Sequence, residues 1–336
     1  MLPNIYFASA RDTSIANRDE SFIRSLKIVC TKTNPGSVVE RAENADIVLV
    51  DERYDYRTWR YRDELIQCAF LRRHGERVCV INHDCYSRVF LPGLYVSLDC
   101  SQPPLLDACS APYKRDLWQV PVADFFEFSP QNLFAFRGTF HTHSIRKKLF
   151  KALENSTEGN IEELHKAFHK HDCNDQEIYI QQIRNAAFSL CPRGLSPHSY
   201  RLYESMQLGR CPVVISDNWI PPTGPNWEEF VVRIEESNIR STLSLMLKQH
   251  DQAKNLGKKA QAAWKEYFSW PARYRTFLNL VERFHGSREN RFSMEDMMEI
   301  WHGREIHKLY SWTIFGRARQ RLRNTMSNLL EKPPPG

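Results

Sequence analysis

Short apolar runs alternate with amphipathic stretches along most of the chain. A first series of runs predicts strands near Asn4–Ala8, Asp46–Asp51, Arg77–Asn82 and Leu94–Leu98. A second series predicts strands near Leu133–Phe136, Ala187–Cys191, Pro212–Ser216 and Phe230–Ile234. Several of these are continuous runs of Val, Ile, Leu and Phe rather than strict alternations, which is typical of parallel strands covered on both faces.

Helical periodicity lies between the strands. It predicts helices at Arg60–His74, Ser144–Glu154, Ile161–His171, Gln176–Asn185 and Pro197–Leu208, followed by Ile239–Gln249, Gln252–Phe268 and Ala272–His285. Strands and helices that alternate in two series predict two doubly wound α/β domains. The proline-bearing stretch Val120–Pro130 separates the series and is the predicted linker.

Length and composition agree with this organisation. The 336 residues suffice for two domains, and 42% apolar and 26% charged residues are ordinary globular values. No apolar run reaches the ~18–20 residues of a membrane span, and the N-terminus lacks a secretory signal pattern. Nine cysteines without a Cys-x-x-Cys pair indicate reduced thiols. We therefore expect a cytoplasmic protein.

Positive charge is concentrated near the end of the chain. Residues 301–332 hold seven Lys or Arg and two Glu, a local net charge of +5 out of +6 for the whole chain. The favoured interpretation is a helix that braces the first domain, and contact with an anionic membrane surface is compatible with it. Nucleic-acid binding is not expected, because aromatic residues are few here and no recognition motif accompanies them.

The densest chemical signal lies in residues 187–217. A strand ends at Cys191, a Pro-Arg-Gly turn follows, and Ser196 with Pro197 predicts the start of a helix that ends before Gly209. The N-terminus of such a helix lies at the carboxyl edge of a parallel sheet. Its free N–H groups and partial positive charge suit a phosphate or diphosphate.

Side chains along this unit match that use. Arg193 precedes the predicted helix, and Ser199 and Arg201 lie in its first turns. Arginine can grip phosphate with two parallel hydrogen bonds. Glu204 shares the same helix face and could accept hydrogen bonds from ribose hydroxyls. The alternative is an ordinary strand–helix–strand unit whose arginines lie on a solvated face.

These residues resemble the signature of exostosin-like glycosyltransferases. The resemblance is carried by Cys191-Pro-Arg-Gly194, by Ser199-x-Arg201-x-x-Glu204, by 209–217, and upstream by Phe134-Ala-Phe-Arg-Gly138 with Arg146. It is specific over residues 133–240. It implies the GT-B fold, in which two Rossmann-like domains face a central cleft and are followed by C-terminal helices. It also implies inversion at the anomeric centre and a donor that is commonly a UDP-sugar.

The resemblance also divides the chain and assigns a donor site. It implies an acceptor-side domain over 1–125, a nucleotide-sugar-binding domain over 130–285, and a basic helical tail over 286–336 that braces the first domain. The implied donor-binding residues are Arg137, Gly138, Arg146, Arg193, Gly194, Ser196, His198, Ser199, Tyr200, Arg201 and Glu204. The arginines would neutralise the leaving diphosphate, and the chain has no Asp-x-Asp motif, so no metal or other cofactor is expected.

Inversion requires a general base for the acceptor hydroxyl. We expect it in a first-domain loop at the carboxyl end of a strand. Asp84, with its neighbour His83, is the first candidate, Asp12 is the second, and Asp51 and Glu52 are the third. Polar residues at strand ends are also common turn and cap formers.

Histidines give weaker signals. His165 and His169 have a spacing that can bind zinc on a helix face, but the charged residues around them favour a solvated helix. His141 and His143 follow Gly138 closely, and this position suits either a substrate contact or an ordinary loop.

The sequence therefore predicts an inverting, metal-independent glycosyltransferase. The donor is expected to be a UDP-sugar and the acceptor a glycan or lipid-linked glycan, in surface polysaccharide synthesis at the cytoplasmic face of a membrane. Two alternatives remain open. One keeps the fold but uses a GDP- or CMP-sugar, and the other is a carbohydrate- or nucleotide-binding protein without catalysis.

Overall fold

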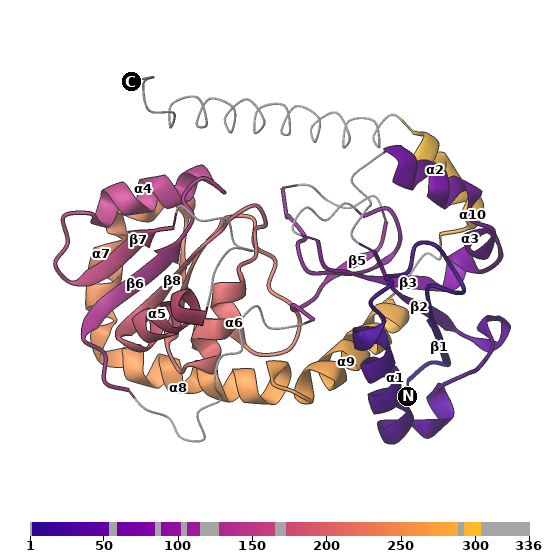
Figure 1. Ribbon diagram of the computed structural model, residues 1–336, viewed down its shortest axis with the longest axis horizontal. Helices are drawn as coiled ribbons and strands as arrows, with labels where there is room; N and C mark the ends of the chain where they lie inside the picture. The colour runs from indigo at the N-terminus through magenta and orange to yellow at the C-terminus, as the bar shows by residue number, and fades with distance from the viewer. Residues whose placement is uncertain are drawn as a thin grey trace, which may run out of the picture.

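The chain forms two five-stranded parallel sheets (Figure 1). The computed structural model describes residues 2–53, 59–84, 89–101, 106–114, 128–164, 173–287 and 292–303. The first sheet holds β1 (Ile5–Ala8), β2 (Ile47–Asp51), β3 (Val78–Asn82), β4 (Gly93–Tyr95) and β5 (Ala108–Ser110). The second holds β6 (Asn132–Gly138), β7 (Gly159–Glu163), β8 (Ala186–Pro192), β9 (Cys211–Ile215) and β10 (Val232–Ile234). The predicted α/β class with two sheets is confirmed.

The first sheet lies between two layers of helices, as its continuous apolar strands require. Its strand order follows the chain, from β1 to β5. The helices are α1 (Ser21–Thr33), α2 (Trp59–Gln67), α3 (Ala69–His74), α9 (Ala272–Ser287) and α10 (Met294–His302). One face is covered by α1 and α9, through Leu26 and Phe277. The other is covered by α2, α3 and α10, through Leu65, Leu71 and Trp301.

The second sheet has the order β7-β6-β8-β9-β10, so the winding reverses between β6 and β8. Its helices are α4 (Ser144–Leu153), α5 (Cys173–Arg184), α6 (Tyr200–Gln207), α7 (Thr242–Lys248) and α8 (Ala253–Ala263). One face packs on α4 and α7 through Leu149 and Met246. The other packs on α6 and α8 through Met206 and Ala260. Open α/β sheets bind ligands outside the carboxyl ends of the strands at such a reversal.

Short helical turns complete the described elements. They lie at Pro35–Ser37, Ala42–Asn44, Gly75–Arg77, Trp227–Glu229, Glu236–Ser241, His250–Gln252 and Trp264–Phe268.

Several described elements differ from the sequence prediction, including strand β5, which was not predicted. Residues 161–163, expected to begin a helix, lie in β7, because backbone pairing with β6 decides the conformation of this half-exposed acidic segment. The helix expected over 60–74 is divided into α2 and α3. Helix α1 was not predicted, although Phe22, Ile23, Leu26 and Cys30 give it a buried face with helical spacing.

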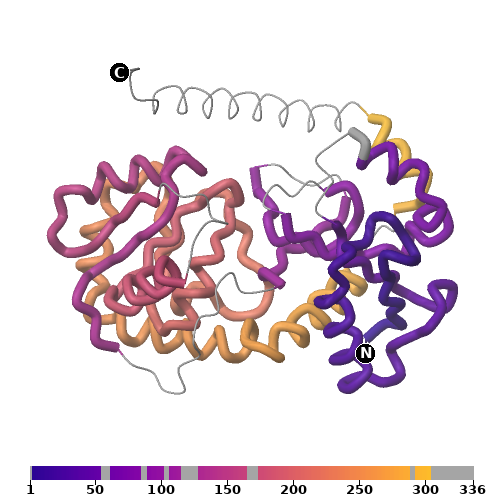
Figure 2. The backbone as a smooth tube through the Cα atoms, in the orientation of Figure 1, coloured from indigo at the N-terminus to yellow at the C-terminus, as the bar shows by residue number. Residues whose placement is uncertain are grey.

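The C-terminal helices join the two halves. Figure 2 shows α8 and α9 running in succession beneath the second and then the first sheet. Since α9 packs on the first sheet, the range 130–285 predicted for the second domain includes a helix that belongs with the first. Helix α10, from the predicted bracing tail, also packs there, and the Trp301 indole N–H donates to the Phe90 carbonyl at 2.8 Å. Residues 304–336 and most of the predicted linker lie outside the described residues.

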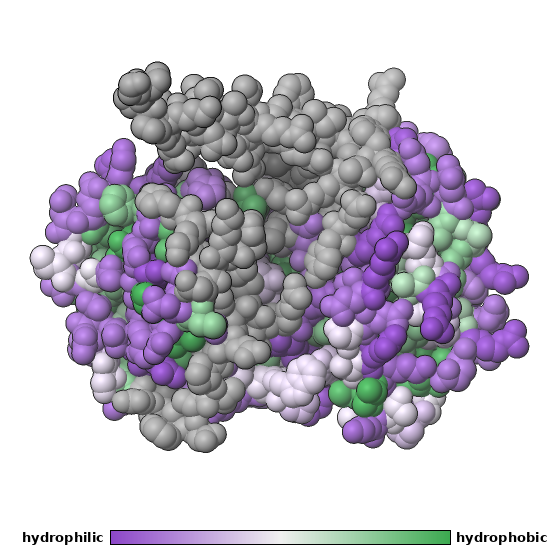
Figure 3. All heavy atoms as spheres, viewed as in Figure 1, coloured by the Kyte–Doolittle hydropathy of each residue, from purple (hydrophilic) through white to green (hydrophobic). Residues whose placement is uncertain are grey.

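Hydrophilic residues cover most of the described surface on the face shown in Figure 3. Large hydrophobic side chains that are exposed lie on separate elements, at Ile28, Ile178, Leu195, Leu247 and Trp270. Among the described residues, no helix has the length and apolar content needed to span a membrane.

Candidate active site

The candidate site is formed by two loops at the carboxyl edge of the second sheet. The β6–α4 loop (residues 139–143) and the β8–α6 loop (residues 193–199) follow neighbouring strands on either side of the winding reversal. Arg146, in the first turn of α4, reaches the second loop, because its Nε donates to the Arg193 carbonyl at 3.0 Å. A Cβ on Gly194 would lie 2.9 Å from the Arg146 guanidinium, so glycine permits this close approach.

Arg146 ties the two loops together through backbone carbonyls. Its terminal nitrogens donate to Thr139 O at 2.9 Å and to Pro192 O at 3.3 Å. Burial, and then the nearby charge of Arg201, lower the pKa of Arg146 to about 10, so it stays charged at neutral pH. Arg146 therefore holds the loops in place and adds positive charge beneath them.

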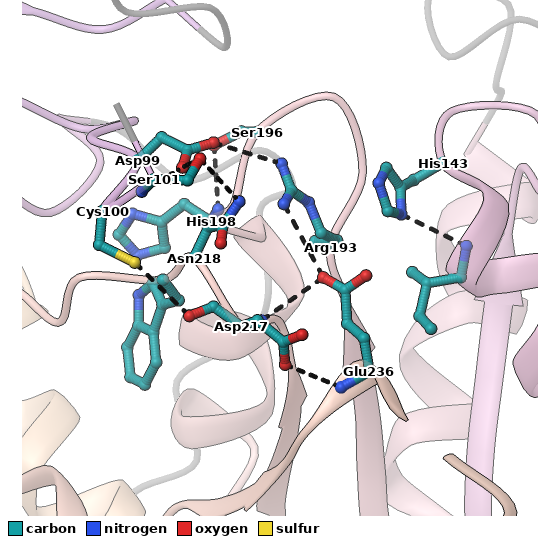
Figure 4. A network of polar contacts seen from close by, with 12 residues as sticks. Asp99, Cys100, Ser101, His143, Arg193, Ser196, His198, Asp217, Asn218 and Glu236 are labelled. Carbon is teal, nitrogen blue, oxygen red and sulfur yellow. Dashed lines mark hydrogen bonds and ion pairs between the residues drawn. The ribbon is translucent and has the colours of Figure 1, made fainter. Parts of the chain in front are cut away.

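Arg193 carries a charge that its neighbours only partly satisfy (Figure 4). Its side chain is 11% exposed, and its two ion pairs, with Asp99 at 3.7 Å and Glu236 at 3.8 Å, are longer than hydrogen bonds. Its Nε is buried and has no hydrogen-bond partner among the described residues. Buried charged groups are normally hydrogen-bonded. An anion at this point would supply what the guanidinium lacks.

His143 closes the other side of the site as the N-cap of α4. Its Nδ1 accepts the backbone N–H of Ile145 at 3.3 Å. Burial first, and then the charges of Arg193, Arg146 and Lys148, lower the pKa of His143 to about 4. Arg193, Arg146 and Lys148 thus place positive charge near this imidazole.

Three other predicted donor residues form a packed layer behind the loops. Arg137, at the end of β6, is paired with Glu162 and with Asp175, the latter at 3.4 Å. Arg201 donates to the Arg137 carbonyl and lies over the rings of Phe136 and Tyr179. Glu204 accepts the hydroxyl of Tyr179. Gly138 packs closely beside this layer, because a Cβ there would lie only 3.1 Å from the Phe136 ring. The charges of these side chains are thus already engaged within the protein.

Three further predicted donor residues, Ser196, His198 and Tyr200, contact the first domain. Ser196 Oγ lies 2.7 Å from Ser97 Oγ, and His198 Nδ1 lies 2.7 Å from the Val96 carbonyl. The Tyr200 ring stacks on that of Tyr113, with centroids 3.5 Å apart. Because the partners follow β4 and β5, the carboxyl edges of the two sheets face one another.

The predicted start of the site helix is wrong. Helix α6 begins at Tyr200, and its N-cap is Ser199, which makes no side-chain cap hydrogen bond. Ser196 and Pro197 precede the helix, since Ser196 and His198 are held by the first domain instead. The predicted end is confirmed, because Gly209 follows the helix with φ of 66°.

The predicted base residues lie at the carboxyl edge of the first sheet, in different settings. Asp84 is buried, and its N–H donates to Asn82 Oδ1 at 3.1 Å. His83 is also buried, against the rings of Phe22 and Phe277. Asp12 accepts hydrogen bonds from Ser9 N, Ser9 Oγ and Tyr6 Oη, and these outweigh partial burial and lower its pKa. Asp12 thus has the contacts of a turn-forming carboxylate.

Two acidic residues of the site, Asp99 and Glu236, were not predicted. Glu236 follows β10, so the carboxyl-edge rule applied to Asp84 could have found it. Asp99 reaches Arg193 from the other domain through packing that no local pattern encodes. The suggested zinc pair His165 and His169 lies outside the described residues, within which no group of three or more His, Cys, Asp or Glu is placed to hold a metal.

Comparison with known proteins confirms the resemblance to exostosin-like glycosyltransferases. Residues 115–249 match the Exostosin GT47 domain. Exostosin-1 of Bos taurus is 32% identical over 94 residues, which are 27% of this chain and 13% of that protein. A probable glucuronoxylan glucuronosyltransferase of Arabidopsis thaliana is 29% identical over 145 residues, 43% of this chain and 28% of that protein. The matched segments are thus less than a third of the length of these relatives.

Two solved structures are similar over most of the chain at low sequence identity. The match with a glycosyltransferase from Rickettsia africae ESF-5 covers 81% of this chain and 84% of that protein, with 10% identity and a TM-score of 0.36. The match with MurG of Acinetobacter baumannii covers 79% of this chain and 78% of that protein, with 10% identity and a TM-score of 0.33.

Proposed function

Because residues 115–249 match the exostosin family, we propose on this premise that the chain is a glycosyltransferase. It transfers a sugar from a nucleotide-sugar donor, in our proposal UDP-linked, to a glycan or lipid-linked glycan acceptor. The observation that carries the proposal is Arg193, whose guanidinium lies at the winding reversal of the second sheet with its hydrogen-bonding capacity unfilled. A diphosphate supplies the anionic oxygens that such a group binds.

The proposed chemistry is stabilisation of the leaving diphosphate by fixed positive charge. As the bond from the anomeric carbon to the phosphate oxygen breaks, negative charge grows on that oxygen. Arg193 binds it directly, Arg146 contributes charge from behind, and the N-terminus of α4 adds its dipole. We propose that this set acts without a divalent cation.

Inversion places the acceptor hydroxyl opposite the leaving group, on the side of the first domain. Asp84 remains our first candidate for the base that accepts the hydroxyl proton, because it follows β3 at the edge that faces the second sheet. Once the proton moves to the carboxylate, the acceptor oxygen bonds to the anomeric carbon and the nucleoside diphosphate leaves.

Calorimetric titration with UDP, GDP, CMP and ADP tests the donor site. We expect UDP to bind wild-type protein and Arg193→Gln to weaken binding by about tenfold or more, because a hydrogen bond to a charged group contributes about 1.5–3 kcal/mol. Lys147→Gln removes an exposed charge from α4 and is the matched control. If none of the four nucleotides binds wild-type protein, the proposal is wrong.

Transfer is assayed with UDP-glucose and UDP-glucuronic acid, the second chosen because some similar proteins are named glucuronosyltransferases. Asp84→Asn should bind UDP normally and lose transfer. Normal turnover by this variant would show that another residue is the general base. Binding of UDP without transfer to any glycan would favour the non-catalytic alternative.

The proposed setting is surface polysaccharide synthesis at the cytoplasmic face of a membrane. The support for membrane contact is the basic sequence of residues 304–332, which suits an anionic lipid surface. Cosedimentation with phosphatidylserine vesicles, compared between the full chain and one ending at residue 303, measures that contact.

A further inference from the structure

His143 is a candidate ligand that the predicted donor site does not include. It ends the β6–α4 loop, whereas Arg193 begins the β8–α6 loop. In Figure 4 the imidazole of His143 lies beside the guanidinium of Arg193, each carried by its own loop. Thr142 and Gly194, the neighbours of the two residues, approach closely, since a Cβ on Gly194 would lie 3.4 Å from Thr142 Oγ1. A group held by Arg193 would therefore also face His143.

The cap hydrogen bond fixes which imidazole nitrogen is available. Nδ1 accepts the N–H of Ile145, so in the neutral ring the proton must be on Nε2. Nε2–H is then a hydrogen-bond donor directed away from α4. In Figure 4 this nitrogen points from the helix toward the side of the ring on which Arg193 lies. The histidine is thus held in a defined tautomer and orientation by the helix that it caps.

Cations surround this ring. Arg146 and Lys148 approach it from α4 and Arg193 from the β8–α6 loop, and burial together with their charges holds the pKa of His143 near 4. The acids nearest the site, Asp99 and Glu236, are directed at Arg193. A neutral side chain that donates a hydrogen bond into an electropositive space is matched to an anionic oxygen.

We propose that His143 is a further donor-binding residue, whose Nε2–H hydrogen-bonds an oxygen of the diphosphate held by Arg193. This inference rests on the proposed function, since it names one more contact at the same site. His143 and Arg193 then grip the anion from opposite loops across the winding reversal. As the sugar–phosphate bond breaks, the same hydrogen bond stabilises the oxygen on which charge develops.

A consequence follows for the protonation of His143. A bound diphosphate offsets the charges of Arg193 and Arg146, so it should raise the pKa of the imidazole above its value in the free protein. Because the bound state then holds the proton more tightly, binding takes up protons in the interval between the two pKa values. A His143 remote from the bound diphosphate would show no such response.

The experiment separates capping from binding by the choice of variant. Asn is a good N-cap, so His143→Asn keeps a side-chain acceptor for Ile145 N–H but removes the imidazole donor. We expect its Tm to stay within about 2 °C of wild type, while its affinity for UDP falls about tenfold or more. His141→Asn, at an exposed position of the same loop, should bind UDP as wild type does.

The second readout is the imidazole itself. The NMR signal that His143→Asn removes identifies His143, and its titration should move to higher pH when UDP is added to wild-type protein. Unchanged UDP affinity in His143→Asn, or an imidazole titration unaffected by UDP, overturns the inference while leaving the proposed function standing. Failure of wild-type protein to bind any of the four nucleotides overturns both.

Discussion

Four arginines near the carboxyl edge of the second sheet have the same charge and different surroundings. Arg137 is neutralised by two carboxylates, Arg146 is bonded to three carbonyls, and Arg201 is bonded to a carbonyl and packed on two rings. Arg193 and Arg137 each have a buried Nε that lacks a partner among the described residues, but only the ion pairs of Arg193, at 3.7 and 3.8 Å, are longer than hydrogen bonds. What a charged residue can bind thus depends on what it already contacts.

Glu52, in the first domain, makes stability depend on pH. It is 2% exposed and accepts hydrogen bonds from Tyr61 and from Asn82, the latter at 2.6 Å. Burial raises its pKa to about 7, and also raises that of Asp51 to about 6 despite an ion pair with Lys114 at 3.0 Å. Both carboxylates therefore hold protons in the folded chain that the unfolded chain releases near pH 4.

The free energy of unfolding should accordingly fall as the pH rises from 5 to 8. Since the folded state binds more protons in this interval, unfolding becomes easier by up to about 3 kcal/mol from Glu52 alone. Urea unfolding of wild type and Glu52→Gln at pH 5 and pH 8 measures this change in unfolding free energy. The amide does not titrate, so the variant should lose most of this dependence. An equal change in unfolding free energy between pH 5 and pH 8 for the two proteins would contradict the prediction.

At the scale of elements, some strands and helices are predictable from local sequence, and others depend on pairing or packing with distant segments. The apolar runs from Ile47 to Val50 and from Ala187 to Cys191 were recognisable as buried parallel strands because nearly every residue in them is apolar. Residues 161–163 were not, because an acidic edge strand becomes visible only when it pairs with β6. The start of α6 was misplaced because contacts with the first domain hold Ser196 and His198 outside the helix.

Close packing of α8 on the turn after α6 gives a test at this scale. A Cβ on Gly257 would lie 2.3 Å from the Gly209 carbonyl oxygen, so Gly257→Ala must displace backbone and should cost about 2 kcal/mol or more of unfolding free energy. Gly286, in α9, has no atom within 4 Å of such a Cβ. Gly286→Ala should instead stabilise the protein by about 0.5–1 kcal/mol. Chemical denaturation distinguishes the two, and similar effects would contradict the close contact.

At the scale of the whole molecule, the described residues join the halves in two places. The loops after β4 and β5 bond to those after β8 and β9, as Ser110 Oγ does to the Ile220 carbonyl at 2.7 Å. Helix α9 then returns from the second half and completes the core of the first, as Figure 1 shows. The site loop 193–199 belongs to the first of these connections, so the donor loop and the first domain are mechanically linked.

The return of α9 predicts that a change late in the chain destabilises the first sheet. Phe277 is fully buried, and its ring lies 5.1 Å from that of Phe22. Phe277→Ala should lower the unfolding free energy by about 3–5 kcal/mol. Hydrogen exchange should increase in β1–β3 more than in β6–β10. Arg275→Ala, at an exposed position of α9, should change stability by less than about 0.5 kcal/mol. Equal loss of protection in both sheets would contradict this assignment.

The sequence by itself determined the α/β class, most strands, the Pro-Arg-Gly turn and the family resemblance. All of these depend on residues that are close together in the sequence: continuous apolar runs, helical spacing, and a motif of a few tens of residues. Only the tertiary structure decided that α9 belongs with the first sheet, that residues 161–163 form a strand, and that the ion pairs of Arg193 are longer than hydrogen bonds. These depend on partners far away in the chain, such as Asp99 for Arg193, and burial and charge satisfaction arise from such contacts.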